Sequence, residues 1–205
     1  MKEVRINICQ VSLNRDIPLI IENLINFKNL YNKVRLFIIC PHNQKKEFQD
    51  KIKFDEVSII SEDDVIKFNK FESIYNNLNG EIDYKKQFHE RLKWYYQQAL
   101  KLTFVFNFIN ETNENIVIWD ADTIILKKIS FFKDDISIKY GNFFEFHKAY
   151  YKTNKNILKR LPSYFISFLN QFIGITKAEY EFFFENFLYK KSEKISLAEY
   201  FSELI

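Results

Sequence analysis

Two aspartates separated by one alanine stand between two apolar runs near the middle of the chain. Residues 115–126 read NIVIWDADTIIL, with Asp120 and Asp122 as the two carboxylates. In an extended chain, alternate side chains project to the same face, so both carboxylates would point to one place. Like charges this close repel each other unless a cation lies between them. The spacing predicts a site for Mg²⁺ or Mn²⁺, which prefer oxygen ligands and often also bind substrate phosphates. The alternative is an ordinary Asp-x-Asp turn at the end of a strand.

A second group of polar residues lies on the segment that precedes this motif. Between residues 85 and 107, apolar residues recur at steps of three and four, which predicts an amphipathic helix. On its other face stand the residues that could meet a ligand: Lys93, Trp94, Gln97, Gln98 and Lys101. A solvated helix face would also be polar, and this alternative stays open. However, a tryptophan and two adjacent glutamines are unusual on such a face, and Lys101 could meet a diphosphate as a point charge.

The elements that must position these residues alternate between strand and helix. The patterns predict strands at 4–11, 34–40, 57–60 and 115–119, and helices at 18–31, 44–52 and 85–107. Residues 71–84 suggest only a loop at Asn79-Gly80. Short links between alternating strands and helices are typical of a parallel, doubly wound sheet.

Ligands of such sheets gather beyond the carboxyl ends of the strands. Asp16 follows the first predicted strand and lies in that zone. It could accept a hydrogen bond from a nucleotide base or ribose. An acid at the start of a helix is equally well explained by the helix dipole.

Length and composition indicate one globular domain. The 205 residues are 47% apolar and 28% charged, and 30 basic residues are nearly balanced by 27 acidic ones. A net charge of +3 gives no strong field for a polyanion, so nucleic acid is disfavoured as a partner. Cys9 and Cys40 each end an apolar run, as small buried residues of a reducing compartment would. Without a signal peptide or an apolar run long enough for a bilayer, we expect a cytoplasmic protein.

The two motifs resemble those of a bacterial glycosyltransferase-like family of the GT-A type, met in capsule and surface-polysaccharide gene clusters. Residues 94–102 match its W-x-x-Q-Q-x-x-K-L helix, and Asp120–Thr123 matches its D-A-D-T stretch. Three later segments are also similar, at residues 145–158, 167–173 and 199–203. Members of that family usually continue further, so we expect a chain that is shortened at its C-terminus.

The resemblance implies a GT-A-like α/β fold in a single domain. Residues 1–126 would form its nucleotide-binding half and residues 127–205 its acceptor side. It also implies a metal-dependent glycosyltransferase that moves a sugar from a UDP- or GDP-linked donor to a growing surface glycan or lipid-linked glycan. Mn²⁺ or Mg²⁺ would stabilise the negative charge that develops on the leaving diphosphate.

The resemblance further implies roles for single residues. Asp122 would bind the metal, and Asp120 the metal or the ribose of the donor. His147 could complete the metal coordination, although a hydrogen-bonded histidine at a strand end is equally expected. Glu145, two residues earlier, could position the acceptor hydroxyl, and Glu203 is the candidate base if the enzyme inverts the sugar. The remaining donor contacts would come from Asp16, Trp94, Gln97, Gln98 and Lys101.

Two other functional classes stay open. The chain could transfer another nucleotide-activated group or a nucleotide on the same fold, or it could be a non-catalytic binding module whose aspartates are structural. Residues 177–191 carry a wide aromatic face made by Tyr180, Phe183, Phe184, Phe187 and Leu188. We expect this face to pack in the core; the alternative is a peripheral contact with the inner face of the membrane.

Overall fold

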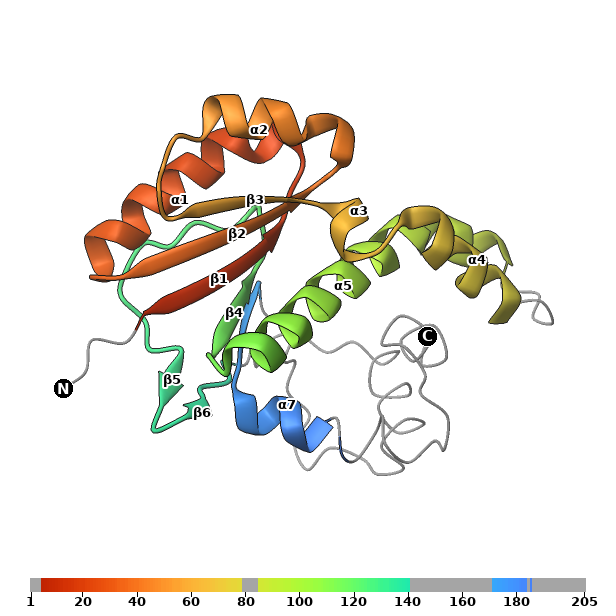
Figure 1. Cartoon of the computed structure of the whole chain (residues 1–205). Coiled ribbons are helices and arrows are strands. Elements are labelled where there is room, and N and C mark those ends of the chain that lie inside the picture. The colour runs from red at the N-terminus through yellow and green to blue at the C-terminus, as the bar shows by residue number, and fades with distance from the viewer. Residues whose placement is uncertain (1–4, 79–84, 141–170, 184, 186–205) are drawn as a thin grey trace.

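A five-stranded sheet forms the centre of the molecule (Figure 1). The computed structural model describes residues 5–78, 85–140, 171–183 and 185. The strands of the sheet, in the order β3-β2-β1-β4-β7, are β3 (Val57–Ser61), β2 (Val34–Cys40), β1 (Ile6–Val11), β4 (Ile116–Trp119) and β7 (Phe172–Ile175). The first four are parallel, and β7 runs antiparallel to β4 at one edge. The expected mixed α/β fold with a mostly parallel sheet is confirmed.

Helices cover both faces of this sheet. They are α1 (Ile17–Leu30), α2 (Lys45–Lys51), α3 (Glu62–Val65), α4 (Phe68–Leu78), α5 (Lys85–Thr112) and α7 (Lys177–Phe183). Helices α1 and α2 lie on one face and α5 on the other (Figure 1). The short strands β5 (Phe132–Lys133) and β6 (Ile136–Ser137) form a separate ribbon. The sequence did not predict α4, and the loop expected at Asn79-Gly80 lies outside the described residues.

The alternation of side chains along the strands divides the core into two layers. From β1, Ile8 packs toward Phe27 of α1, whereas Cys9 packs toward Leu100 of α5. Both cysteines are buried and unpaired, as expected. Burial raises the pKa of the Cys9 thiol to about 12, an effect that the nearby Lys101 ammonium only partly offsets. Cys9 therefore acts as a small apolar residue.

Helix α5 is longer than its sequence pattern predicts. It continues five residues past Asn107, because Phe108 and Ile109 are still buried against the sheet. The helix ends where Asn113 adopts a left-handed conformation with φ of 57° and donates its N–H to Ile109. Asparagine tolerates this conformation better than most residues, which explains the position of the end.

The apolar run after Asp122 has no regular secondary structure at residues 123–126. The backbone N–H of Ile125 donates to Asn23 Oδ1 at 2.8 Å, and its carbonyl accepts from Asn26 at 3.2 Å. These amides of α1 satisfy the backbone groups that a neighbouring strand would otherwise satisfy. Leu126 is 87% exposed, so the run also lacks the burial that a central strand needs.

The aromatic residues of α7 pack on α5. The rings of Tyr180 and Phe183 lie 5.3 and 5.4 Å from the ring of Phe106. Core packing is therefore confirmed for these two residues; Phe184, Phe187 and Leu188 lie outside the described residues. Among the described helices, none is both long and apolar enough to cross a membrane.

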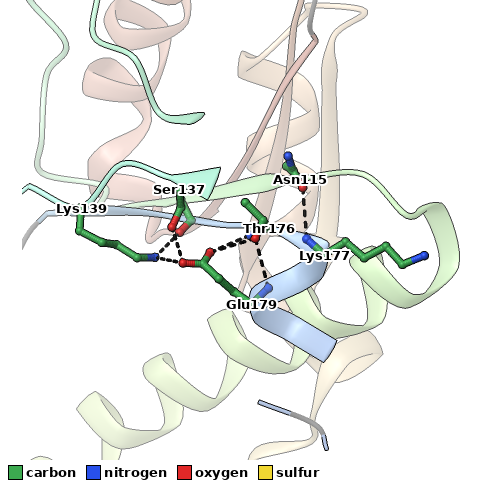
Figure 2. A network of polar contacts seen from close by, with 7 residues as sticks. Asn115, Ser137, Lys139, Thr176, Lys177 and Glu179 are labelled. Carbon is green, nitrogen blue, oxygen red and sulfur yellow. Dashed lines mark hydrogen bonds and ion pairs between the residues drawn. The ribbon is translucent and has the colours of Figure 1, made fainter. Parts of the chain in front are cut away.

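A reciprocal capping box begins α7 (Figure 2). The Thr176 N–H donates to Glu179 at 3.0 Å, and the Glu179 N–H donates back to the Thr176 hydroxyl at 3.2 Å. Ser137 also donates a hydrogen bond to the Glu179 carboxylate, and Lys139 forms an ion pair with it at 2.9 Å. This one carboxylate therefore joins α7 to the segment that contains β6.

The Glu179 network predicts a pH-dependent stability. Burial raises the pKa of Glu179, but the hydrogen bonds from Ser137, Thr176 and Lys139 outweigh it and leave the pKa below its ordinary value of 4.5. Because folding lowers this pKa, the ionised carboxylate stabilises the fold at pH values above its ordinary pKa. This contribution is lost as the pH falls through the folded-state pKa. We expect Glu179→Gln to lower the free energy of unfolding by about 1 kcal/mol at pH 7, and by less at pH 3. Urea unfolding at both pH values measures this difference.

The matched control is Glu181→Gln on the same helix. Glu181 is exposed and contacts Lys177 at 3.5 Å, so its replacement should change stability little at either pH. A loss for Glu179→Gln that is equally large at pH 7 and pH 3 would contradict the assignment.

Candidate functional site

A pocket of about 760 Å³ lies beyond the carboxyl ends of the parallel strands. Its walls include Ser12 after β1, Pro41 after β2, Glu62 after β3 and Asp120 after β4. Helix α1 leaves β1 on one face of the sheet and α5 reaches β4 on the other, so β1 and β4 flank the topological switch point. Open α/β sheets bind their ligands in this crevice. The volume is in the usual range for small-molecule sites.

Eight residues that the sequence singled out line this one pocket. They are Asp16, Lys93, Trp94, Gln97, Gln98, Lys101, Asp120 and Asp122. Five of them lie on α5, and from Trp94 onward they take relative positions 0, 3, 4 and 7, which places those four on one face of that helix. The other three come from the segments that follow β1 and β4. The fold thus brings together two motifs that are separated in the chain.

Lys101 and Asp120 form an ion pair at the floor of the pocket. Lys101 Nζ lies 2.5 Å from Asp120 Oδ1, and the Lys101 side chain is only 5% exposed. A buried ammonium requires a nearby anion, because leaving it unpaired is strongly unfavourable. Lys101 is therefore not part of a solvated face, and its charge already contacts a carboxylate. The sequence had suggested instead that Lys101 could contact a diphosphate directly.

The D-A-D-T segment is a turn and not an extended chain. The Thr123 N–H donates to the Asp120 carbonyl at 3.1 Å, which closes the turn. The rule that alternate side chains share a face, used above for Asp120 and Asp122, therefore does not apply here. Both side chains still line the pocket: Asp120 is 36% exposed and held by Lys101, and Asp122 is exposed.

Residues from three parts of the chain hold this turn, and the sequence did not identify them in this role. Asn23 of α1, which is 2% exposed, donates to the Thr123 carbonyl, and so does the Trp119 indole at 2.9 Å. Gln171 accepts the Asp120 N–H at 2.7 Å and the Thr123 hydroxyl at 2.8 Å. One feature of the sequence could have identified Asn23, since a polar residue on the buried stripe of a helix needs a partner. No such feature marked Gln171.

Ser12 is a further pocket residue that the sequence did not single out. It is 3% exposed, and its hydroxyl has no hydrogen-bond partner among the described residues. Burying a hydroxyl without a partner is unfavourable, so a ligand that bonds to it gains more than it would from an exposed serine. The feature of the sequence that could have identified Ser12 is its place directly after β1.

Asp16 and Glu62 are the other two acidic residues that line the pocket. Asp16 accepts the Leu13 N–H at 2.8 Å, so its carboxylate closes the chain at the entry to α1. This contact accounts for Asp16 without a ligand. Glu62, the first residue of α3, also lines the pocket. Burial, and to a lesser degree the charge of Asp63, raise the pKa of Glu62.

The D-A-D turn fits a metal that binds together with a phosphate ligand. The described part of the chain contains no group of three or more His, Cys, Asp or Glu side chains that could hold an ion without help. Mg²⁺ is commonly held by one or two carboxylates, with substrate phosphates and water as the other ligands. Asp120 and Asp122 meet that requirement. Glu145, His147 and Glu203 lie outside the described residues.

The ion pair predicts that the two aspartates contribute unequally to stability. Asp120→Ala leaves the Lys101 ammonium buried without an anion, so we expect the free energy of unfolding to fall by about 3 kcal/mol. Asp122→Ala removes an exposed carboxylate and should change it by less than about 0.5 kcal/mol. Urea unfolding measures both. Lys101→Met combined with Asp120→Ala should regain much of the loss, and equal effects of the two single variants would contradict the prediction.

Comparison with known proteins places the chain in a family. The family of unknown function DUF6492 matches residues 13–170, which is more than half of the chain. Neither a curated protein nor a solved structure gives a match. The matched region contains the α5 face and the D-A-D-T turn. The chain therefore belongs to the family of unknown function DUF6492.

Proposed function

We propose that this protein is a metal-dependent glycosyltransferase with a GT-A-like fold. It would transfer a sugar from a UDP- or GDP-linked donor to a growing surface glycan. One observation carries the proposal: the α5 face and the D-A-D-T turn, which resemble the two motifs of GT-A-type enzymes, line one pocket at the switch point of the sheet. A solvated helix face and an unrelated turn would have no reason to share a pocket.

In this proposal the residues of the pocket floor have separate tasks. Asp122 and Asp120 hold Mn²⁺ or Mg²⁺, which when bound stabilises the charge on the diphosphate leaving group. Lys101 fixes the position of Asp120 through their ion pair. The buried Ser12 hydroxyl offers a hydrogen bond to the ligand at the end of β1.

The proposal assigns the acceptor side to residues outside the described part of the chain. Glu145 positions the acceptor hydroxyl, Glu203 is the base if the reaction inverts the sugar, and His147 adds a metal ligand. The acceptor itself is a capsule, lipopolysaccharide or related glycan, on the strength of the resemblance alone. In α7, the rings of Tyr180 and Phe183 pack on Phe106 of α5, whereas Phe182 is 62% exposed.

A thermal-shift screen tests this function. UDP-, GDP- and CMP-linked sugars are added with and without Mn²⁺, and stabilisation should require both nucleotide and metal because each supplies ligands or charge for the other. Release of free nucleotide diphosphate in the presence of glycan acceptors then identifies sugar transfer. Release of pyrophosphate would instead indicate nucleotidyl transfer. The absence of any metal-dependent shift would favour a non-catalytic module.

Asp122→Asn should separate metal binding from folding. Because Asp122 is exposed, the variant should unfold at nearly the wild-type temperature, yet lose the Mn²⁺-dependent shift and the turnover that requires metal. Asp50→Asn is the matched control, since Asp50 is an exposed aspartate of α2 that does not line the pocket. Full metal-dependent turnover in Asp122→Asn would remove the metal role from this residue.

A further inference from the structure

The two tryptophans of the chain have opposite surroundings. Trp119 is 2% exposed, and its indole N–H donates to the Thr123 carbonyl. Trp94 lines the pocket and is 44% exposed. Its ring meets that of Tyr95 edge-on, with centroids 5.0 Å apart, and this contact supports one side of the indole. An aromatic ring that is held in place while exposed inside a pocket is suited to stacking on a flat ligand.

Helix α5 extends from the Asp120 end of the pocket to its opposite end. At the first end, Lys101 contacts Asp120. Five residues earlier in the helix, the Tyr96 hydroxyl donates to the carbonyl of Ile66, just after α3, at 2.5 Å. Trp94 precedes Tyr96 by two residues. It therefore belongs to the end of the pocket that is remote from the D-A-D turn.

The spacing on α5 decides which ring of a donor can reach Trp94. Trp94 and Lys101 share a helix face and are seven residues apart, which is about 10 Å along the axis. If the diphosphate lies at the D-A-D turn, the transferred sugar stays at that end, because it is bonded directly to the diphosphate. The base is separated from the outer phosphate by the inner phosphate and the ribose, so it extends away from the turn.

We propose that Trp94 is the stacking surface for the nucleobase of the donor, a role that rests on the proposed function. The exposed indole face becomes covered by the base when the nucleotide binds. Stacking on an aromatic ring tolerates any base, because every base has a π face. Gln97 and Gln98, which follow on the same helix face, carry amide donors and acceptors that can bond to the base or the ribose.

Calorimetric titration of the 205-residue chain tests this role. The ligands are UDP, GDP and inorganic pyrophosphate, each with Mn²⁺, and the proteins are wild type, Trp94→Ala and Trp94→Phe. Loss of base stacking should weaken UDP and GDP binding to Trp94→Ala by about 5- to 100-fold. Pyrophosphate has no base, so its affinity should stay unchanged. Trp94→Phe keeps a ring and should retain most of the nucleotide affinity.

Iodide quenching of tryptophan fluorescence gives a second readout that does not depend on activity. Trp94 is accessible to iodide and Trp119 is buried, so saturating UDP with Mn²⁺ should reduce the quenching of wild type. The same addition should have little effect on Trp94→Phe, in which only Trp119 emits. Manganese pyrophosphate should not protect Trp94 of the wild type from iodide.

Two results would overturn the inference, and they differ in what they leave standing. If UDP or GDP binds wild type and Trp94→Ala equally well, the nucleotide site remains but the base lies elsewhere. If pyrophosphate binding falls together with nucleotide binding, Trp94 acts on the phosphate end and not on the base. If neither nucleotide binds wild type, the proposed function fails and the role of Trp94 fails with it.

Discussion

The position of helix α5 depends on one buried charge. Lys101 is a charged residue of this helix that is only 4% exposed, and its ammonium must lie beside an anion. Asp120, directly after β4, is that anion. A shift of α5 by one residue would separate them, so the pair fixes the register of the helix against the strand. The same register places Trp94, Gln97 and Gln98 along the strand ends.

Hydrogen bonds from other elements also hold the turn that carries Asp122. Bonds from Asn23, Trp119 and Gln171 reach it from α1, from β4 and from the segment before β7. A binding site works best when rigid elements fix its contact residues before the ligand arrives. The turn therefore presents its one exposed aspartate, Asp122, from a backbone that three separate parts of the chain hold in place.

Local periodicity explains which features the sequence predicted. The first four strands and the helix that precedes β4 follow from apolar spacing, because burial on one or two faces imposes that spacing directly. The irregular run at Ile125 has a strand-like composition, yet the amides of Asn23 and Asn26 replace its strand partner. Likewise, the D-A-D motif was visible, whereas Ser12 and Gln171 became apparent only in the fold. Contacts between residues 48 or more positions apart leave no trace in local spacing.

The charges around the pocket make a metal requirement physically reasonable. The described lining contains four carboxylates and three cations, Asp16, Glu62, Asp120, Asp122, Arg15, Lys93 and Lys101, which gives a formal charge of −1. A diphosphate would meet net repulsion there, apart from local pairing. One divalent cation at the D-A-D turn changes the total to +1 and reverses that sign. Because Lys101 is already paired with Asp120, a bound ion would supply the added charge at the turn, which would couple metal binding to nucleotide binding in the proposed enzyme.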